Sequence, residues 1–111
     1  MNSMTYPLNF QGYYTKSADL PDYSGIYCIY ACTHDVHART VSIRKLLYIG
    51  ESEDIHDRVS NHERRKDWES KLRNGEVLCF NVAPISPEDD RKHAEVAMIY
   101  YHKPPCNRGS A

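Results

Sequence analysis

Apolar residues fall into three short runs, and each run predicts a β-strand. Residues 26–32 are β-prone and apolar on both parities, which is typical of a strand buried on both faces. Strand character resumes over residues 41–49. The polar segment 33–40 between them is too short for a crossover helix, so we expect an antiparallel hairpin with this segment as its loop or tip. A third core strand is predicted over residues 76–83.

The segment after the second strand predicts a helix. Ser52 can cap it, and acidic residues follow in the first turn, where the positive end of the helix dipole favours them. One side of this helix carries Ile55, Val59 and His62, at offsets of four and seven. Arg58 stands one turn before His62, so we expect the two side chains to border the same face.

The last helix has the clearest start. Ser86 is expected at its cap and Pro87 at its first helical position, with acidic residues behind them. Glu95 is expected at the edge of the inner face, and Pro104-Pro105 ends the helix. The inner face itself is expected to hold residues spaced three, four and seven apart: Ala94, Ala97, Met98 and Tyr101.

The predicted order is strand, strand, helix, helix, strand, helix, where the second helix carries Trp68 and Leu72. This order favours an α/β (α+β) sandwich, with a small, three-stranded, mainly antiparallel sheet flanked by helices. The 111 residues are the usual size of one domain. We expect its core to cover about residues 25–107. Residues 1–24 are then an N-terminal extension, in which the Tyr-rich stretch 12–15 can form an edge strand.

Charge and cysteine content limit the classes of function. Lys and Arg total 14 and Asp and Glu total 15, giving a formal net charge of −1, so any basic surface for nucleic acid must be local. The sequence shows neither a secretory signal nor an apolar run of membrane-spanning length, so a cytoplasmic location without a membrane is expected.

A zinc site is the second reading of two of the four cysteines. Cys28 and Cys32 could combine with His34 and His37, but this spacing matches no common zinc motif. Both cysteines fall inside an apolar strand pattern, where Cys is an ordinary core residue. We therefore favour the core interpretation over the zinc site.

Two tripeptides and three later positions carry a family resemblance. Gly25-Ile26-Tyr27 is followed by Tyr48-Ile49-Gly50, and Arg58 lies ten residues beyond Tyr48. His62 follows one helical turn later, and Glu95 precedes Asn107 by twelve positions. In these motifs and in their order, residues 25–107 resemble the GIY-YIG nuclease family.

The resemblance implies a divalent-metal-dependent endonuclease that hydrolyses phosphodiester bonds in nucleic acid, with DNA as the expected substrate. It implies that Glu95 binds Mg²⁺ or Mn²⁺, and a site of one carboxylate completed by water and substrate phosphate suits Mg²⁺. Arg58 is expected to hold a phosphate oxygen, although an ion pair with Asp54 is the other reading. Asn107 is expected to fix the geometry of the site through its amide.

The group that activates the attacking water is left open by the sequence. The resemblance implies that the hydroxyls of Tyr27 and Tyr48 point into the site, and Tyr27 is our choice for activating or positioning the water. Phenol is a poor base at its usual pKa, near 10. His62 is then the obvious acceptor for its proton, and His62 is itself a candidate for the base.

The chain departs from the family pattern in ways that keep other functions open. The connection between the tripeptides is long, and Glu51 places an acid directly after the second one. Sequence specificity would come from loops, a homodimer or a targeting partner protein. The alternative function is a catalytically weak or inactive module of the same fold that binds nucleic acid or protein.

Further basic residues follow Arg58 and could contact a nucleic-acid backbone: Arg64, Arg65 and Lys66. Glu63, Asp67 and Glu69 interleave with them, so an ordinary solvated helix face is an equally good interpretation.

Overall fold

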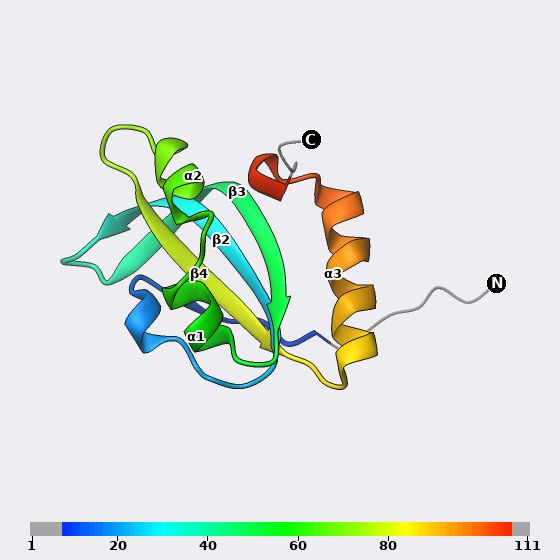
Figure 1. The fold of residues 1–111 in the computed structure, drawn as a ribbon. Coiled ribbons are helices and arrows are strands. Elements are labelled where there is room, and N and C mark those ends of the chain that lie inside the picture. Colours follow the sequence, from blue (N-terminus) through cyan, green and yellow to red (C-terminus); the bar gives the residue numbers. More distant parts are fainter. Residues whose placement is uncertain (1–7, 108–111) are drawn as a thin grey trace.

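A computed structural model describes residues 8–107 as an α+β fold built on one antiparallel sheet (Figure 1). Its strands are β1 (Gln11–Tyr14), β2 (Gly25–Asp35), β3 (Thr40–Ser52) and β4 (Val77–Pro84). They lie in the order β1-β4-β2-β3, and every neighbouring pair is antiparallel. The expected three strands are therefore four in the described residues. The additional strand is β1, which the Tyr-rich stretch forms by pairing with the free side of β4.

The β2–β3 hairpin is longer than predicted. The polar segment 33–40, expected as a loop or hairpin tip, is the tip of this hairpin, but β2 continues into it as far as Asp35 and β3 begins at Thr40. The turn is closed by the Asp35 carboxylate, whose Oδ1 accepts the Ala38 N–H at 2.9 Å. Arg39 adopts a left-handed conformation, with φ of 57°. Backbone pairing thus extends through polar residues because a two-stranded ladder needs no apolar face once its base is anchored in the core.

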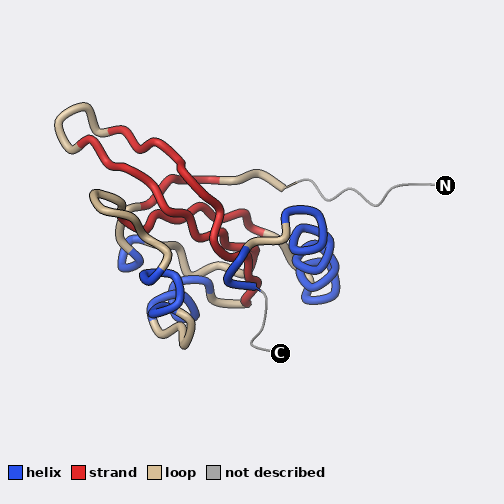
Figure 2. Tube along the Cα trace, turned by 90° about the horizontal axis from the view of Figure 1, so that it is seen from above, coloured by secondary structure: helices blue, strands red, loops and turns tan. Residues whose placement is uncertain are grey.

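Helices cover both faces of the sheet (Figure 2). The elements outside the sheet are α1 (Ile55–Ser60), α2 (Arg65–Ser70), α3 (Glu88–His102) and the short 3-10 helices η1 (Ser17–Asp19) and η2 (Pro105–Asn107). On the α1 and α2 side, Ile55, Val59 and Trp68 pack with Tyr27 and other sheet residues. On the opposite side, Ala94 of α3 packs with Ile26, Cys28 and Ile49. The sandwich expected from the element order is confirmed at this level.

Two helix starts differ from the prediction. Asp54, not Ser52, caps α1: its Oδ1 accepts the Asp57 N–H at 3.0 Å, while the Ser52 hydroxyl binds the Asp54 backbone. Helix α3 begins at Glu88, because Pro87 is extended (φ −83°, ψ −173°) and is itself the cap in place of Ser86.

The inner face of α3 was predicted only in part. Ala94 is buried and Met98 is partly buried, as expected, but Ala97 is exposed and Tyr101 is 80% exposed. Arg91 is buried instead, because it forms an ion pair with Glu51 of β3. The helix therefore contacts the sheet through a narrow row of side chains. It ends as predicted before Pro104 and Pro105, with Lys103 in a left-handed conformation.

The cysteines of the sheet are core residues. Cys28 and Cys32 are buried within β2, while His34 and His37 are exposed near the hairpin turn. None of the helices in the described part of the chain combines the length and the apolar character needed to cross a bilayer.

Candidate active site

The strand register brings Tyr27 and Tyr48 together on the α1 and α2 side of the sheet. Tyr27 of β2 lies opposite Gly50 of β3, and Ile29 lies opposite Tyr48. The two tyrosine rings stack at a centroid distance of 6.2 Å. A Cβ at Gly50 would overlap the ring and hydroxyl of Tyr27, so this position of the ring requires glycine.

The first glycine of the motif has a different steric cause. A Cβ at Gly25 would overlap the backbone carbonyl of Ala83 on β4. Gly25 therefore allows β2 and β4 to approach closely at the end of the sheet that carries Tyr27. Gly50 thus leaves room for the Tyr27 ring itself, and Gly25 allows the strand that carries Tyr27 to pack closely against β4.

His62 is buried and makes a hydrogen bond with each ring nitrogen. Its Nε2 lies 3.0 Å from the Tyr27 hydroxyl, and its Nδ1 accepts the backbone N–H of Arg64 at 3.0 Å. An Nδ1 that accepts carries no proton, so the neutral ring must carry its proton on Nε2. His62 therefore donates to the Tyr27 oxygen.

Burial sets the protonation of both partners. It lowers the pKa of His62 to about 4, and the nearby positive charge of Arg58 acts in the same direction. Burial also raises the pKa of Tyr27, and Tyr48 adds to the increase while Arg58 opposes it. At neutral pH the pair is a neutral imidazole that donates to a neutral phenol.

Trp68 completes the aromatic wall of the site and was not recognised as a site residue from the sequence. Its ring lies 4.5 Å from that of His62 and 5.3 Å from that of Tyr48, between centroids. From the sequence, Trp68 was expected only to lie on the second helix, and such a position is equally typical of an ordinary core residue. Trp68 fixes the position of the imidazole by packing.

Arg58 is held by a neighbouring carboxylate. Its Nη1 and Nη2 donate to the two oxygens of Glu63 at 2.8 and 3.1 Å. Asp54, the alternative partner expected from the helix spacing, instead caps α1. The Arg58 side chain is 39% exposed and that of Glu63 is 67% exposed. The guanidinium hydrogen bond lowers the pKa of Glu63 to about 2. Glu63 thus offers Arg58 two oxygens, as a phosphate would.

Asn107 binds the outer edge of β3. Its Oδ1 accepts the Ile49 N–H and its Nδ2 donates to the Ile49 carbonyl, both at 2.8 Å. Strand β3 is the last strand of the sheet, so these backbone groups have no strand partner. The amide therefore replaces one residue of a missing strand and fixes the segment between Tyr48 and Gly50.

Glu95 approaches the same edge from α3. The backbone N–H of Glu51, two residues beyond Ile49, acts to lower the pKa of Glu95, and the charge of Glu95 raises the pKa of both Tyr27 and Tyr48. Burial and the charge of Glu51 raise the pKa of Glu95. Glu51 is itself paired with Arg91, whose Nε lies 3.0 Å from its Oε1. Glu51 thus has a cationic partner, Arg91, that sequence reasoning did not connect to it.

The surroundings of Glu95 fit a magnesium site of one carboxylate. Within residues 8–107 Glu95 takes part in no ion pair, and its negative charge is disfavoured where it stands, so a cation there would be stabilising. The described residues contain no group of three or more His, Cys, Asp or Glu side chains suited to a metal. A metal held by Glu95 would need water and substrate phosphate as its other ligands.

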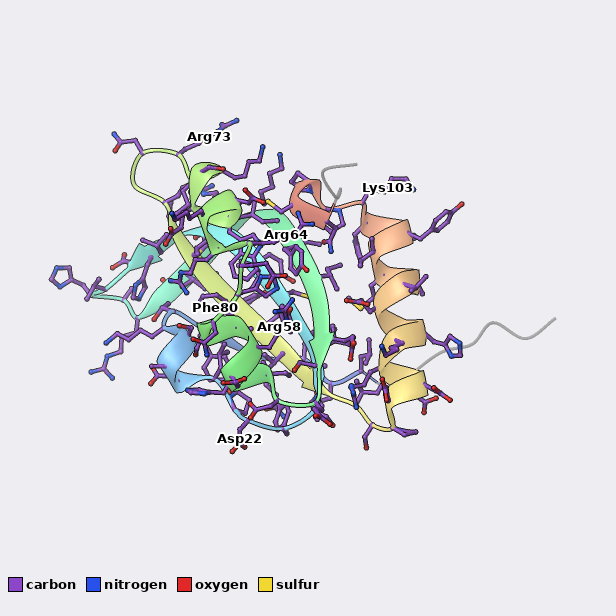
Figure 3. All side chains as sticks on the ribbon, viewed as in Figure 1. Asp22, Arg58, Arg64, Arg73, Phe80 and Lys103 are labelled. Carbon is purple, nitrogen blue, oxygen red and sulfur yellow. The ribbon has the colours of Figure 1, made fainter. Side chains whose placement is uncertain are left out.

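The remaining basic residues that follow Arg58 differ in their availability. Arg64 lies 3.7 Å from Asp67 and 3.4 Å from the Cys106 carbonyl, and Arg65 pairs with Glu69 at 3.3 Å. Lys66 is exposed. Figure 3 shows Arg58 and Arg64 beside β3, on the side from which α1 and α2 cover the sheet.

Comparison of the chain with family models, with curated proteins and with solved structures finds no match.

Proposed function

We propose that this chain is a nuclease of the GIY-YIG type, which uses a divalent cation to hydrolyse phosphodiester bonds in nucleic acid, with DNA as the expected substrate. The observation that carries the proposal is the convergence of five candidate residues from separate elements. Tyr27 comes from β2, Tyr48 from β3, Arg58 and His62 from α1 and the turn after it, and Glu95 from α3.

Packing alone does not account for this set. Tyr27 and Tyr48 would pack as well without hydroxyls, but a buried imidazole and a partly buried carboxylate that forms no ion pair within residues 8–107 both cost stability. Such groups gather where chemistry requires them, and their pKa values are shifted there. The raised pKa of Glu95 and the lowered pKa of His62 support this interpretation.

In the proposed reaction water attacks phosphorus in line with the departing oxygen. A new P–O bond forms as the bond to the departing oxygen breaks; the attacking water releases a proton to solvent, and the departing oxygen, which keeps the electron pair of the broken bond, takes up a proton from solvent. A cation at Glu95 supplies charge neutralisation when bound. Arg58 exchanges the Glu63 carboxylate for a non-bridging phosphate oxygen.

Tyr27 positions the attacking water in this proposal. Its oxygen accepts a hydrogen bond from His62 Nε2–H, so the O–H of Tyr27 itself is free to donate to water or substrate. His62 cannot take the Tyr27 proton in this tautomer, because Nε2 already carries one and Nδ1 is occupied by the Arg64 N–H. We therefore assign His62 the role of orienting Tyr27.

The bidentate hydrogen bond between Arg58 and the Glu63 carboxylate favours a second candidate, a binding module with weak or no catalysis. In that case Arg58 remains with Glu63, and nucleic acid contacts other basic residues. A cleavage assay separates the two candidates: purified protein is incubated with supercoiled plasmid, branched DNA and RNA, each with Mg²⁺, Mn²⁺ or EDTA. Cleavage that requires the metal supports the nuclease. Binding without cleavage of any substrate supports the module.

A further inference from the structure

A cavity of about 310 Å³ lies beside the far half of β3, away from the candidate active site. Four positively charged side chains line it together with one carboxylate: Arg44 and Lys45 of β3, Lys71 and Arg73 of the α2–β4 connection, and Glu76. For a chain with net charge −1, this is a marked local excess of positive charge.

The four cations are available to a ligand. None of them takes part in an ion pair within the part of the chain that the structure describes, whereas Arg58, Arg64 and Arg65 all do. The one acid is already engaged, since Glu76 Oε1 accepts the backbone N–H of Arg73 at 2.8 Å. Glu76 keeps its negative charge in this contact, but four cations against one carboxylate leave the cavity lining with a net positive charge.

Positive charge continues from the cavity to the candidate active site. Arg64 Nη1 donates to the Cys106 carbonyl at 3.4 Å. Burial and the charge of Asp67 raise the pKa of the Cys106 thiol, whereas the charges of Lys71, Arg64 and Lys45 lower it. The charge of Arg64 also lowers the pKa of Tyr48 and that of His62. Figure 3 shows Arg58, Arg64 and Arg73 in succession from α1 toward the α2–β4 connection.

We propose that this cavity is a phosphate-binding site, which holds the backbone of a nucleic acid beside the segment that is cut. The inference rests on the proposed function, because it supplies that site with an anchor for its substrate. A row of unpaired cations on two adjacent segments suits a chain of phosphates, whose affinity for protein comes mainly from such contacts.

Strand geometry gives the spacing between the two sites. Lys45 and Arg44 precede Tyr48 by three and four residues on β3, which is about 10 to 13 Å at about 3.3 Å per residue. One strand of a duplex rises by about 3.4 Å per nucleotide. A backbone running along β3 would therefore reach the cavity about three to four nucleotides from the bond that is cut.

The test measures binding with cleavage removed. The full chain carries Glu95→Gln in every arm, and its affinity for a fluorescein-labelled duplex is measured by anisotropy between 50 and 200 mM NaCl, on the order of the range over which such contacts are screened. The cavity variant adds Lys45→Gln and Lys71→Gln. The matched control adds Lys16→Gln and Arg39→Gln, which remove the same charge from exposed positions outside the cavity.

Each phosphate contact contributes about 0.9 to the slope of log affinity against log salt. The cavity variant should lose about 1.8 of that slope and bind about 50-fold more weakly at 0.1 M salt, while the control stays within about threefold of the parent. Equal affinity of the cavity variant and the control would overturn the phosphate site and leave the nuclease proposal standing. A parent that binds no duplex even at the lowest salt would overturn both. The cavity variant and the control should both unfold at the same temperature as the parent, which shows that a weaker affinity for the duplex is not caused by unfolding.

Discussion

The two hydrogen bonds of His62 determine which proton it can transfer. With the Arg64 N–H on Nδ1 and the Tyr27 oxygen beside Nε2, the neutral ring is a donor to Tyr27. The sequence could place His62 near Arg58 on a helix face, but the Arg64 contact depends on the turn that follows α1. For this reason the choice between base and orienting group needed the structure.

Removal of the Tyr27 hydroxyl tests this pair. Tyr27→Phe should strongly reduce turnover, because the attacking water loses its positioning group. Since His62 Nε2–H then lacks its acceptor, the free energy of unfolding should fall by about 1 to 3 kcal/mol. Cleavage assays and urea unfolding measure the two effects. Tyr30→Phe is the matched control, a tyrosine of the same strand that packs with the α3 side of the core, and it should keep its turnover. Wild-type turnover in Tyr27→Phe would mean that Tyr27 is an ordinary core residue without a role in cleavage.

The pKa of His62 predicts how stability depends on pH. The unfolded state binds a proton below about pH 6.5, whereas folded His62 does so only near its pKa of about 4. Stability is therefore complete above pH 6.5 and falls as the pH decreases toward 4, by up to about 3 kcal/mol. Urea unfolding across this window should show the fall, and His62→Gln should show less of it. An identical pH dependence in the variant would contradict the buried neutral imidazole.

Glu63 competes with substrate for Arg58, so its charge should weaken binding. Glu63→Gln should tighten the binding of a DNA duplex by up to about fivefold, since exposed ion pairs are weak. The control is Glu88→Gln, which also removes one charge and breaks one exposed ion pair, with Lys92. Anisotropy titrations compare the two variants with the wild type. Equal affinity for all three proteins would mean that Arg58 does not contact phosphate.

At the scale of elements, the site depends on how the outer edge of β3 is closed. Asn107 occupies the backbone groups of Ile49, and Glu95 lies beside the backbone of Glu51, two residues further along the same edge. Edge strands of sheets are generally covered, because exposed backbone groups invite pairing with other chains. Here the residues at this edge, Asn107 and Glu95, are also two of the candidate site residues. The same two side chains therefore cover the edge of β3 and contribute to the site.

Asn107→Asp tests this role with almost no change in size. The carboxylate can still accept the Ile49 N–H, but it places an oxygen against the Ile49 carbonyl in place of the amide donor. We expect a loss of about 1 to 3 kcal/mol in the free energy of unfolding, together with reduced turnover. Urea unfolding of Asn107→Asp beside Asn74→Asp, an exposed asparagine in the α2–β4 connection, gives the comparison. Full stability of Asn107→Asp would show that the two hydrogen bonds do not hold β3.

At the scale of the whole molecule, local patterns predicted the order of the elements but not every boundary. Strand periodicity and the Pro104-Pro105 stop act over a few residues, so the sequence carries them directly. Strand β1 depends on the free side of β4, and the burial of Arg91 depends on Glu51 forty residues earlier. The expectation that Tyr101 packs inward was wrong because α3 contacts only a narrow part of the sheet.

The site was predictable to the same extent. Tripeptides and spacings predicted Tyr27, Tyr48, Arg58, His62, Glu95 and Asn107 as candidates, and the structure places them on or beside strands β2 and β3. Trp68 and the Glu63 partner of Arg58 had no signal that distinguished them from a core residue and a solvated acid. The cationic cavity combines β3 with the α2–β4 connection, which are far apart in sequence, so no local pattern could predict it.

The central claim is that Glu95 holds the cation on which cleavage depends, and Glu95→Gln tests it most directly. Glutamine has almost the same size and is a good helix former, so the free energy of unfolding should change by only about 0.5 kcal/mol. The amide is a poor ligand for Mg²⁺, so metal-dependent cleavage should be lost. Binding to DNA should persist or tighten, because one negative charge is gone. The measurement is cleavage of DNA by wild type and variant with Mg²⁺ and with EDTA, beside a binding titration. Loss of cleavage with retained binding is the result we predict, and a variant that cleaves at the wild-type rate with Mg²⁺ would contradict it.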